Sequence, residues 1–266
     1  MNLSDVIRNL NHPNQQISLK AKEKVKSFFS TTDIDAPSRD QKELLRKLKR
    51  MDCLAARELL DFYEEVKNPK LIFENELLTY VRSSRIQEKD FYEAKLFFQR
   101  VFPFFDNTKK LVDCCAGQGL VGIIFALEGK ADEVVLVDNQ QNNNYQGLLN
   151  YAQELTAIKV KYQIGDINVQ ELPSADLIIS VHGCGNLTDK IMDEAIRQST
   201  SFAVMPCCYS ENIHLSLSRE VDFVRTPDVI DALRLKHALD HNYEAKVRHI
   251  NPKITPMNRI LMGWPR

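Results

Sequence analysis

The sequence has no long apolar run and no recognisable leader. No stretch approaches the roughly 18 consecutive apolar residues of a membrane span. The first residues, MNLSD, lack the basic and apolar segments of a secretory signal peptide. We therefore expect no membrane partner and a cytoplasmic location, in which the six cysteines remain free thiols.

An excess of charge of one sign is also missing. The formal net charge is −1 over 266 residues, so total charge gives no argument for nucleic-acid binding. The charges are unevenly distributed: residues 1–50 hold 11 Lys and Arg against 6 acids, and residues 106–266 hold 16 against 20. A basic N-terminal region is compatible with RNA binding, although a solvated helix face produces the same bias.

The apolar pattern divides the chain into two regions. Residues 1–36 are poorly patterned, with a helix expected at about 17–29. Helical spacing is strong after them, with one long helix expected from an N-cap at Ser38 to about residue 66 and further helices at 71–83 and 88–102. We interpret 1–105 as an all-helical N-terminal extension or cap. Residues 106–266 alternate between strand and helix patterns, which predicts an α/β domain.

Seven strands are expected in this second region, at residues 110–113, 133–138, 159–164, 175–181, 201–205, 244–250 and 259–263. The last two follow each other without an intervening helix. Such a two-strand return is how class I methyltransferases close their Rossmann-like sheet. We therefore predict the strand order 3-2-1-4-5-7-6. The two-strand return also argues against a dehydrogenase.

A glycine-rich turn follows the first of these strands. Residues 111–122 read LVDCCAGQGLVG, a strand, a tight turn and a helix N-terminus, the place where α/β sheets bind nucleotide-like ligands. Gly117 and Gly119 let the backbone approach a ligand closely. The spacing also fits a dinucleotide fingerprint, but Asp113 at the strand end would repel a pyrophosphate. A carboxylate there suits the cationic ammonium and sulfonium of S-adenosylmethionine.

Acids at the ends of the next two strands complete the predicted cofactor site. Asp138 is expected to bond the ribose hydroxyls, unless it only caps the following segment. Asp166 is expected near the adenine amino group, unless it only forms a turn. The predicted cofactor-binding residues are Asp113, Cys115, Ala116, Gly117, Gly119, Asp138, Asn139, Asp166 and Ile167.

Five of the six cysteines fall at the carboxyl ends of three strands expected to be neighbours. The predicted catalytic residues are His182, Cys184, Cys207 and Cys208. His182 is a candidate general base. Three roles are open for Cys184 and for Cys207 or Cys208. They could supply the nucleophile of a pyrimidine methylation, or bind zinc together with His182. They could also only pack around the methyl donor. We predict no metal, because adjacent cysteines seldom share one and the sequence has no Cys-x-x-Cys.

Three motifs together resemble a known methyltransferase family. They are VDCCAGQG at residues 112–119, HGCGNLTD at 182–189 and MPCC at 205–208. The family includes eukaryotic tRNA 2′-O-methyltransferases that act near the acceptor stem, and the glutathione S-transferase C-terminal-domain-containing proteins. The resemblance covers about residues 88–266, and residues 1–87 have no counterpart in it.

The resemblance implies an S-adenosylmethionine-dependent methyltransferase, with RNA such as tRNA or rRNA as the favoured substrate. Three alternatives stay open from the residues themselves. They are a methyltransferase acting on a small molecule or a protein, a module that binds the cofactor without turnover, and a nicotinamide-dependent oxidoreductase.

Overall fold

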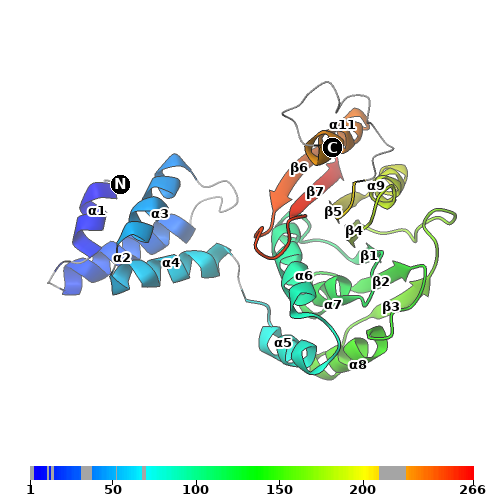
Figure 1. Cartoon of the computed structure of the whole chain (residues 1–266), viewed down its shortest axis with the longest axis horizontal. Helices are drawn as coiled ribbons and strands as arrows, with labels where there is room; N and C mark the ends of the chain where they lie inside the picture. The colour runs from blue at the N-terminus through cyan, green and yellow to red at the C-terminus, as the bar shows by residue number, and fades with distance from the viewer. Residues whose placement is uncertain are drawn as a thin grey trace. The chain divides into compact units, whose positions relative to one another are not determined.

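The computed structural model describes residues 3–10, 12, 15–30, 38–51, 53–67, 70–209 and 226–266. The chain forms two compact units, Met1–Lys70 and Leu71–Arg266 (Figure 1). This division differs from the boundary predicted after residue 105. The physical reason is that the helices of residues 74–101 pack on the helices of the sheet unit, whose hydrophobic core they share.

Four helices build the first unit: α1 (Leu3–Leu10), α2 (Gln15–Ser30), α3 (Arg39–Arg50) and α4 (Leu54–Lys67). Apolar side chains of all four form one core, with Leu10, Val25, Phe29, Leu44 and Leu59 among its buried members. The unit is therefore held together by the usual burial of one apolar stripe per helix.

The prediction of a single helix from Ser38 to about residue 66 is wrong, because α3 ends at Arg50 and α4 begins at Leu54. Met51 has extended backbone angles, and its N–H bonds to Leu48 O as a C-cap. The N-cap itself is confirmed: the Ser38 hydroxyl accepts from Gln41 N, and the Gln41 side chain accepts from Ser38 N. This reciprocal capping box satisfies two backbone donors at the start of α3.

The second unit is a seven-stranded sheet of order β3-β2-β1-β4-β5-β7-β6, as predicted. β1 (Lys110–Cys114), β2 (Glu133–Asp138), β3 (Val160–Ile164), β4 (Leu177–Val181) and β5 (Ser201–Met205) run parallel. β6 (Tyr243–His249) and β7 (Arg259–Pro265) form the antiparallel return, with β7 beside β5. This order and return confirm the Rossmann-like class I methyltransferase fold.

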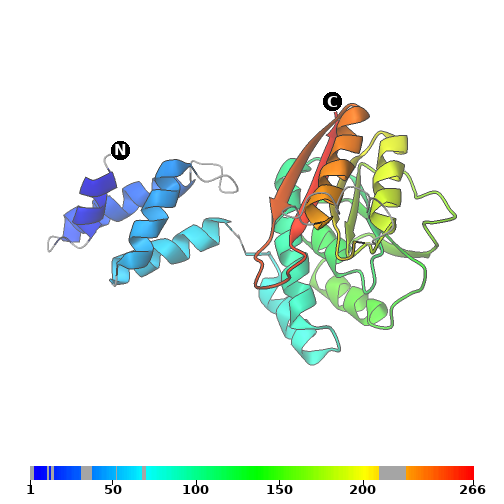
Figure 2. The same ribbon diagram turned by 45° about the horizontal axis from the view of Figure 1, so that its top comes forward.

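Helices cover both faces of this sheet (Figures 1 and 2). They are α5 (Glu74–Ser83), α6 (Glu88–Val101), α7 (Leu120–Leu127), α8 (Tyr145–Leu155), α9 (Leu187–Gln198) and α11 (Thr226–Asp240), with a short 3₁₀ turn at Phe102–Phe104. Leu111 packs on the side of α6, α7 and α8, whereas its neighbour Val112 packs on the side of α9 and α11. This alternation follows the two-residue period of a strand and gives the sheet an apolar layer on each face.

β1 lies at the centre of the unit, between β2 and β4, and α7 follows it directly. Every residue of α7 is buried. The turn between β1 and α7 is therefore held in place by the buried strand before it and the buried helix after it. It lies at the carboxyl edge of the sheet. Among the described residues, no helix combines the length and apolarity needed to span a bilayer.

Candidate functional site

A pocket of about 320 Å³ lies at the carboxyl ends of β1 and β4. In parallel sheets of this kind, ligands bind at that edge. The lining residues come from α6, the glycine-rich turn, the start of α7, the segment before α8 and the end of β4: Asp90, Glu93, Ala94, Cys115, Ala116, Gly117, Gln118, Leu120, Val121, Asn142, Val181 and His182. Of the predicted site residues, it therefore brings together Cys115, Ala116, Gly117 and His182.

The glycine-rich turn has the geometry expected of a ligand-binding loop. Gly117 and Gly119 have φ angles of +54° and +81°, in the left-handed region that favours glycine. A Cβ on Gly117 would meet no other atom, so its backbone faces open space at the pocket wall. A Cβ on Gly119 would instead overlap Leu136, so Gly119 permits close packing of the turn on β2.

Asp138 fastens this turn to the end of β2. Its Oδ2 accepts the Gly117 N–H at 2.8 Å, and its Oδ1 accepts the Asn139 N–H at 2.8 Å. The Tyr162 hydroxyl lies 2.9 Å from Gly117 O, and it holds the same turn from β3. Each carboxylate oxygen has further lone pairs, so a half-buried Asp138 retains capacity for a ribose hydroxyl.

Asp113 has a different place from the one predicted. The residue is 1% exposed, does not line the pocket, and accepts the Gly122 N–H at 3.0 Å. Burial raises the pKa of Asp113 to about 7. The Asp113 carboxyl therefore stabilises the first turn of α7 through the Gly122 N–H. The carboxylates that line the pocket are those of Asp90 and Glu93 on α6.

The half-buried His182 and the buried Glu93 form a pair at the pocket wall. His182 Nε2 lies 2.9 Å from Glu93 Oε2, and Glu93 is 2% exposed. Burial raises the pKa of Glu93, but hydrogen bonding and charge interaction with His182 and bonds from Thr255 and Lys89 outweigh it, so the net shift is downward. We assign the Nε2 proton to the bond with the ionised Glu93, so Nδ1 is the ring nitrogen that is left to exchange a proton with a ligand.

Two pocket residues have unusual backbone angles. Cys115 and His182 have φ angles of +57° and +68°, although neither is glycine. Such conformations cost energy and gather at functional sites. His182 is held in place by a hydrogen bond from its N–H to Met205 O at 3.0 Å.

The three predicted thiols come together beside this pocket, outside its lining. Cys184 Sγ lies 2.8 Å from Cys207 Sγ, and Cys207 Sγ lies 3.6 Å from Cys208 Sγ. Burial raises the pKa of Cys184 and Cys207, and raises that of Cys115 to about 12. The thiols of Cys115, Cys184 and Cys207 are therefore protonated at neutral pH, which disfavours nucleophilic attack by them. Pyrimidine attack by one of them stays a prediction.

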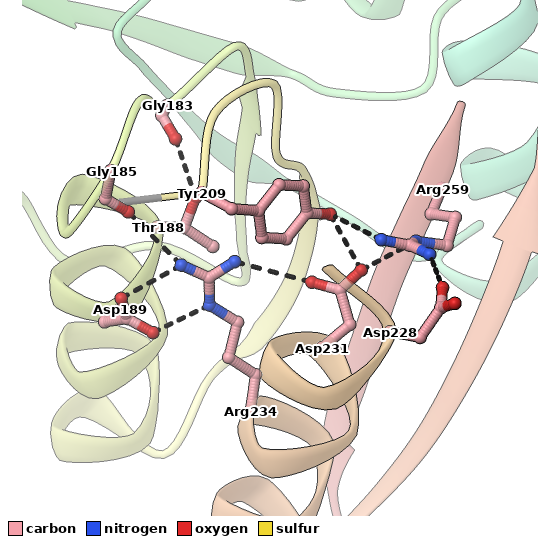
Figure 3. Close-up of polar contacts among 9 residues, drawn as sticks. All are labelled: Gly183, Gly185, Thr188, Asp189, Tyr209, Asp228, Asp231, Arg234 and Arg259. Carbon is pink, nitrogen blue, oxygen red and sulfur yellow. Dashed lines mark hydrogen bonds and ion pairs between the residues drawn. The ribbon is translucent and has the colours of Figure 1, made fainter. Parts of the chain in front are cut away.

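A buried network anchors the loops that carry these thiols (Figure 3). Arg234 on α11 forms an ion pair with Asp189 and donates to Gly185 O at 3.2 Å. The Tyr209 hydroxyl donates to Asp231 Oδ2 at 2.8 Å. Arg259 on β7 pairs with Asp231 and Asp228 and donates to the Tyr209 hydroxyl, as Figure 3 shows.

Besides Asp113, Gly119 and Asp138, three further predicted cofactor residues lie outside the pocket lining. Asn139 is exposed, and Asp166 accepts bonds from Asn168 in a local turn. Ile167 packs partly against the core on the α9 side of the sheet. Their roles toward a cofactor stay predictions.

The sequence interpretation missed Asp90, Glu93, Gln118 and Asn142, which line the pocket. Asp90 accepts from the Gln118 side chain at 3.2 Å, so α6 and the glycine-rich turn share a polar contact. The three-residue spacing of Asp90 and Glu93 on one helix face, within an aromatic run, was the available signal. Nothing in the sequence linked Glu93 to His182, 89 residues away.

The sheet order and the glycine-turn pocket define a class I methyltransferase architecture. Residues 92–213 match a family model described as a methyltransferase domain. The chain therefore contains a methyltransferase domain, as the motifs predicted.

Curated relatives carry the name glutathione S-transferase C-terminal domain-containing protein, which confirms that part of the predicted resemblance. The Drosophila melanogaster homologue is 25% identical over 157 residues, covering 55% of this chain and 25% of its own. The Homo sapiens protein is 28% identical over 202 residues, covering 59% and 30%. The chain thus spans less than a third of the length of these relatives.

Solved structures of methyltransferases are also similar. The B. subtilis M1A22 tRNA methyltransferase TrmK matches with a TM-score of 0.42 and 12% identity, covering 64% of this chain and 65% of that one. M. jannaschii TYW2, in complex with AdoMet, matches with a TM-score of 0.42 and 21% identity, covering 69% and 78%.

The buried Asp113 predicts a pH-dependent stability. Its pKa of about 7 in the folded chain exceeds the ordinary value of 3.8, so the folded state holds this proton more tightly than the unfolded chain. The contribution favours folding fully below about pH 4 and is lost as pH rises through about 7. Asp113→Asn, which cannot ionise, should therefore gain stability relative to the wild type between pH 5 and 7.5.

Urea unfolding at several pH values measures this difference. Asp132→Asn, at an exposed acid immediately before β2, is the control and should follow the wild type. Parallel pH curves for the wild type and Asp113→Asn would show that Asp113 has an ordinary pKa.

Proposed function

We propose that the chain is an S-adenosylmethionine-dependent methyltransferase that acts on RNA. The observation that carries the proposal is the pocket between the glycine-rich turn and the His182–Glu93 pair, at the carboxyl edge of a methyltransferase-type sheet. The match to a methyltransferase domain over residues 92–213 supports the same chemistry.

The residues at this pocket fit the cofactor. Gly117 forms a part of the pocket wall that has no side chain. The carboxylate of Asp138, at the end of β2, accepts the N–H of Gly117. Asp90 and Glu93 supply negative charge for the cationic methionine end, the role predicted for Asp113. A carboxylate-lined cavity of this kind favours a cationic ligand over the pyrophosphate of a dinucleotide.

The cofactor, when bound, supplies an electrophilic methyl group. The chain supplies the proton acceptor on the other side. With Nε2–H bonded to Glu93, His182 takes a proton at Nδ1 from a hydroxyl or nitrogen of the acceptor. Glu93 positions the ring and stabilises the imidazolium cation that forms, because its carboxylate is buried and ionised and its Oε2 lies 2.9 Å from His182 Nε2.

RNA as the acceptor is supported by the surface of the first unit. Exposed basic side chains lie on α2 and α3: Lys20, Lys24, Arg39, Lys42, Arg46, Lys49 and Arg50. Lys42, Arg46 and Lys49 follow one face of α3 at helical spacing, opposite the buried Leu44 and Leu48. A basic helix face of this kind binds phosphates without sequence preference.

Loss of the Asp138 carboxylate should weaken cofactor binding. Asp138→Ala is expected to reduce the affinity for S-adenosylhomocysteine by about 1.5–3 kcal/mol, the range for a charge-assisted hydrogen bond. Titration calorimetry measures it, with Asp132→Ala as the control at an exposed acid near the other end of β2. NAD binding in place of S-adenosylhomocysteine would refute the cofactor assignment, and unchanged affinity would reduce Asp138 to a cap.

The His182–Glu93 pair predicts a division between turnover and binding. His182→Ala should lower turnover by about 10²–10⁴-fold while the cofactor affinity stays nearly unchanged. Glu93→Gln should lower turnover by a smaller factor and change the pH profile of kcat, because the ring loses its charged partner. Glu88→Gln, on the exposed side of α6 and paired with Arg82, is the control. Wild-type turnover in both pocket variants would show that the His182–Glu93 contact has only a structural role.

The basic face of α3 predicts the salt dependence of RNA binding. Replacing Lys42 and Lys49 with alanine should weaken binding and make the slope of log K against log salt shallower by about 1.4, or 0.7 for each charge lost on single strands. Replacing Lys109 and Lys159, at the amino ends of β1 and β3, is the matched control. Filter binding over a salt series measures both. Equal slopes for the two double variants would remove α3 from the RNA surface.

A further inference from the structure

The cluster of Cys184, Cys207 and Cys208 is a group of metal-binding atoms that the proposed methyl transfer does not use. The three sulfur atoms all lie within 4.8 Å of one another. The nearest pair are 2.8 Å apart, and the adjacent cysteines place their sulfur atoms 3.6 Å apart. Three converging thiols supply three of the four ligands that a tetrahedral zinc site needs.

The Cys207–Cys208 separation is close to that of two sulfur ligands on one metal ion, whereas the 2.8 Å between Cys184 and Cys207 would have to widen by about 1 Å. Zinc–sulfur bonds of about 2.3 Å at tetrahedral angles place the sulfur atoms about 3.8 Å apart. The backbone of the Cys207–Cys208 pair already directs both side chains to the same side at nearly that distance. The expectation from sequence that adjacent cysteines do not share a metal rested on spacing alone, which cannot show the direction of a side chain.

The loops that carry the thiols are held firmly by other contacts. Cys184 lies after β4 and Cys207 after β5, two strands that pair along their length. The Thr188 hydroxyl, 1% exposed, donates to Gly183 O at 2.7 Å, and Arg234 donates to Gly185 O (Figure 3). Tyr209, directly after Cys208, is bonded to Asp231 and Arg259. The ligand positions are therefore fixed before any ion binds, as an effective metal site requires.

We propose that Cys184, Cys207 and Cys208 form a zinc-binding site that joins the loop after β4 to the loop after β5. Three thiolates and no carboxylate select a thiophilic ion over magnesium or calcium. Each thiol gives up its proton to solvent as its sulfur bonds the ion. Three protein ligands leave a fourth coordination position for water or an acceptor group. His182 is not part of this cluster, because only the three sulfur atoms belong to the group of ligand atoms that lie within 4.8 Å of one another.

This proposal does not depend on the proposed function, because metal binding is measured without any methyl acceptor. The full chain is expressed with added zinc, purified under a phosphine reductant without chelator, and analysed for metals by mass spectrometry. About one zinc per chain is expected. Cobalt(II) added to the metal-free protein should give the near-ultraviolet thiolate charge-transfer band of a sulfur-ligated site.

Serine variants locate the ligands. Cys184→Ser, Cys207→Ser and Cys208→Ser should each weaken zinc binding by about 100-fold or more and reduce the cobalt band. Cys53→Ser, at a thiol of the first unit, is the control and should bind like the wild type. Circular dichroism checks that each variant is folded, and Cys184→Ala with Cys207→Ala in one chain provides a second test without hydroxyl groups.

Two results would overturn the proposal. One is reduced wild-type protein that holds no zinc and gives no cobalt band. The other is a folded double alanine variant with the same zinc content as the wild type, which would place the metal elsewhere.

Discussion

The structure depends on the way the turn after β1 is held. Two carboxyls at the ends of neighbouring strands fix it from different sides: Asp113 accepts the N–H of Gly122 at the start of α7, and Asp138 accepts the N–H of Gly117 at the pocket wall. The Tyr162 hydroxyl meets the carbonyl of the same Gly117. With both faces of β1 and all of α7 buried, the turn has no freedom to collapse into the pocket. A preformed cofactor wall follows from this arrangement.

The chemistry of the pocket comes from elements on opposite sides of that turn. α6, which the sequence analysis assigned to the N-terminal extension, contributes Glu93, and the end of β4 contributes His182. The two meet because α6 packs on α7 and so belongs to the sheet unit. The beginning of this compact unit at Leu71, 35 residues before the predicted boundary of the α/β domain at 106, thus has a functional consequence.

The sequence predicted the sheet well because its signals were local. β2 and β5 have the predicted bounds, since each is an apolar segment ended by turn residues. The break between α3 and α4 was missed because apolar residues continue across it at steps of three and four, at Leu48, Met51, Ala55 and Leu59. The burial of Asp113 beside Gly122 was not foreseen, because position at a strand end does not reveal which way a side chain points. The gathering of the strand-end thiols was foreseen from strand order, whereas the His182–Glu93 pair needed the packing of α6 in three dimensions.

The central claim is that this pocket transfers a methyl group to RNA, and labelled S-adenosylmethionine tests it most directly. The purified full chain is incubated with the methyl-labelled donor and with separate cellular pools of RNA, protein and small metabolites. The account predicts label in RNA, in an amount that falls at least about 100-fold with His182→Ala. Label confined to the protein or metabolite pool, or no label in any pool from a chain that binds the donor, would contradict it.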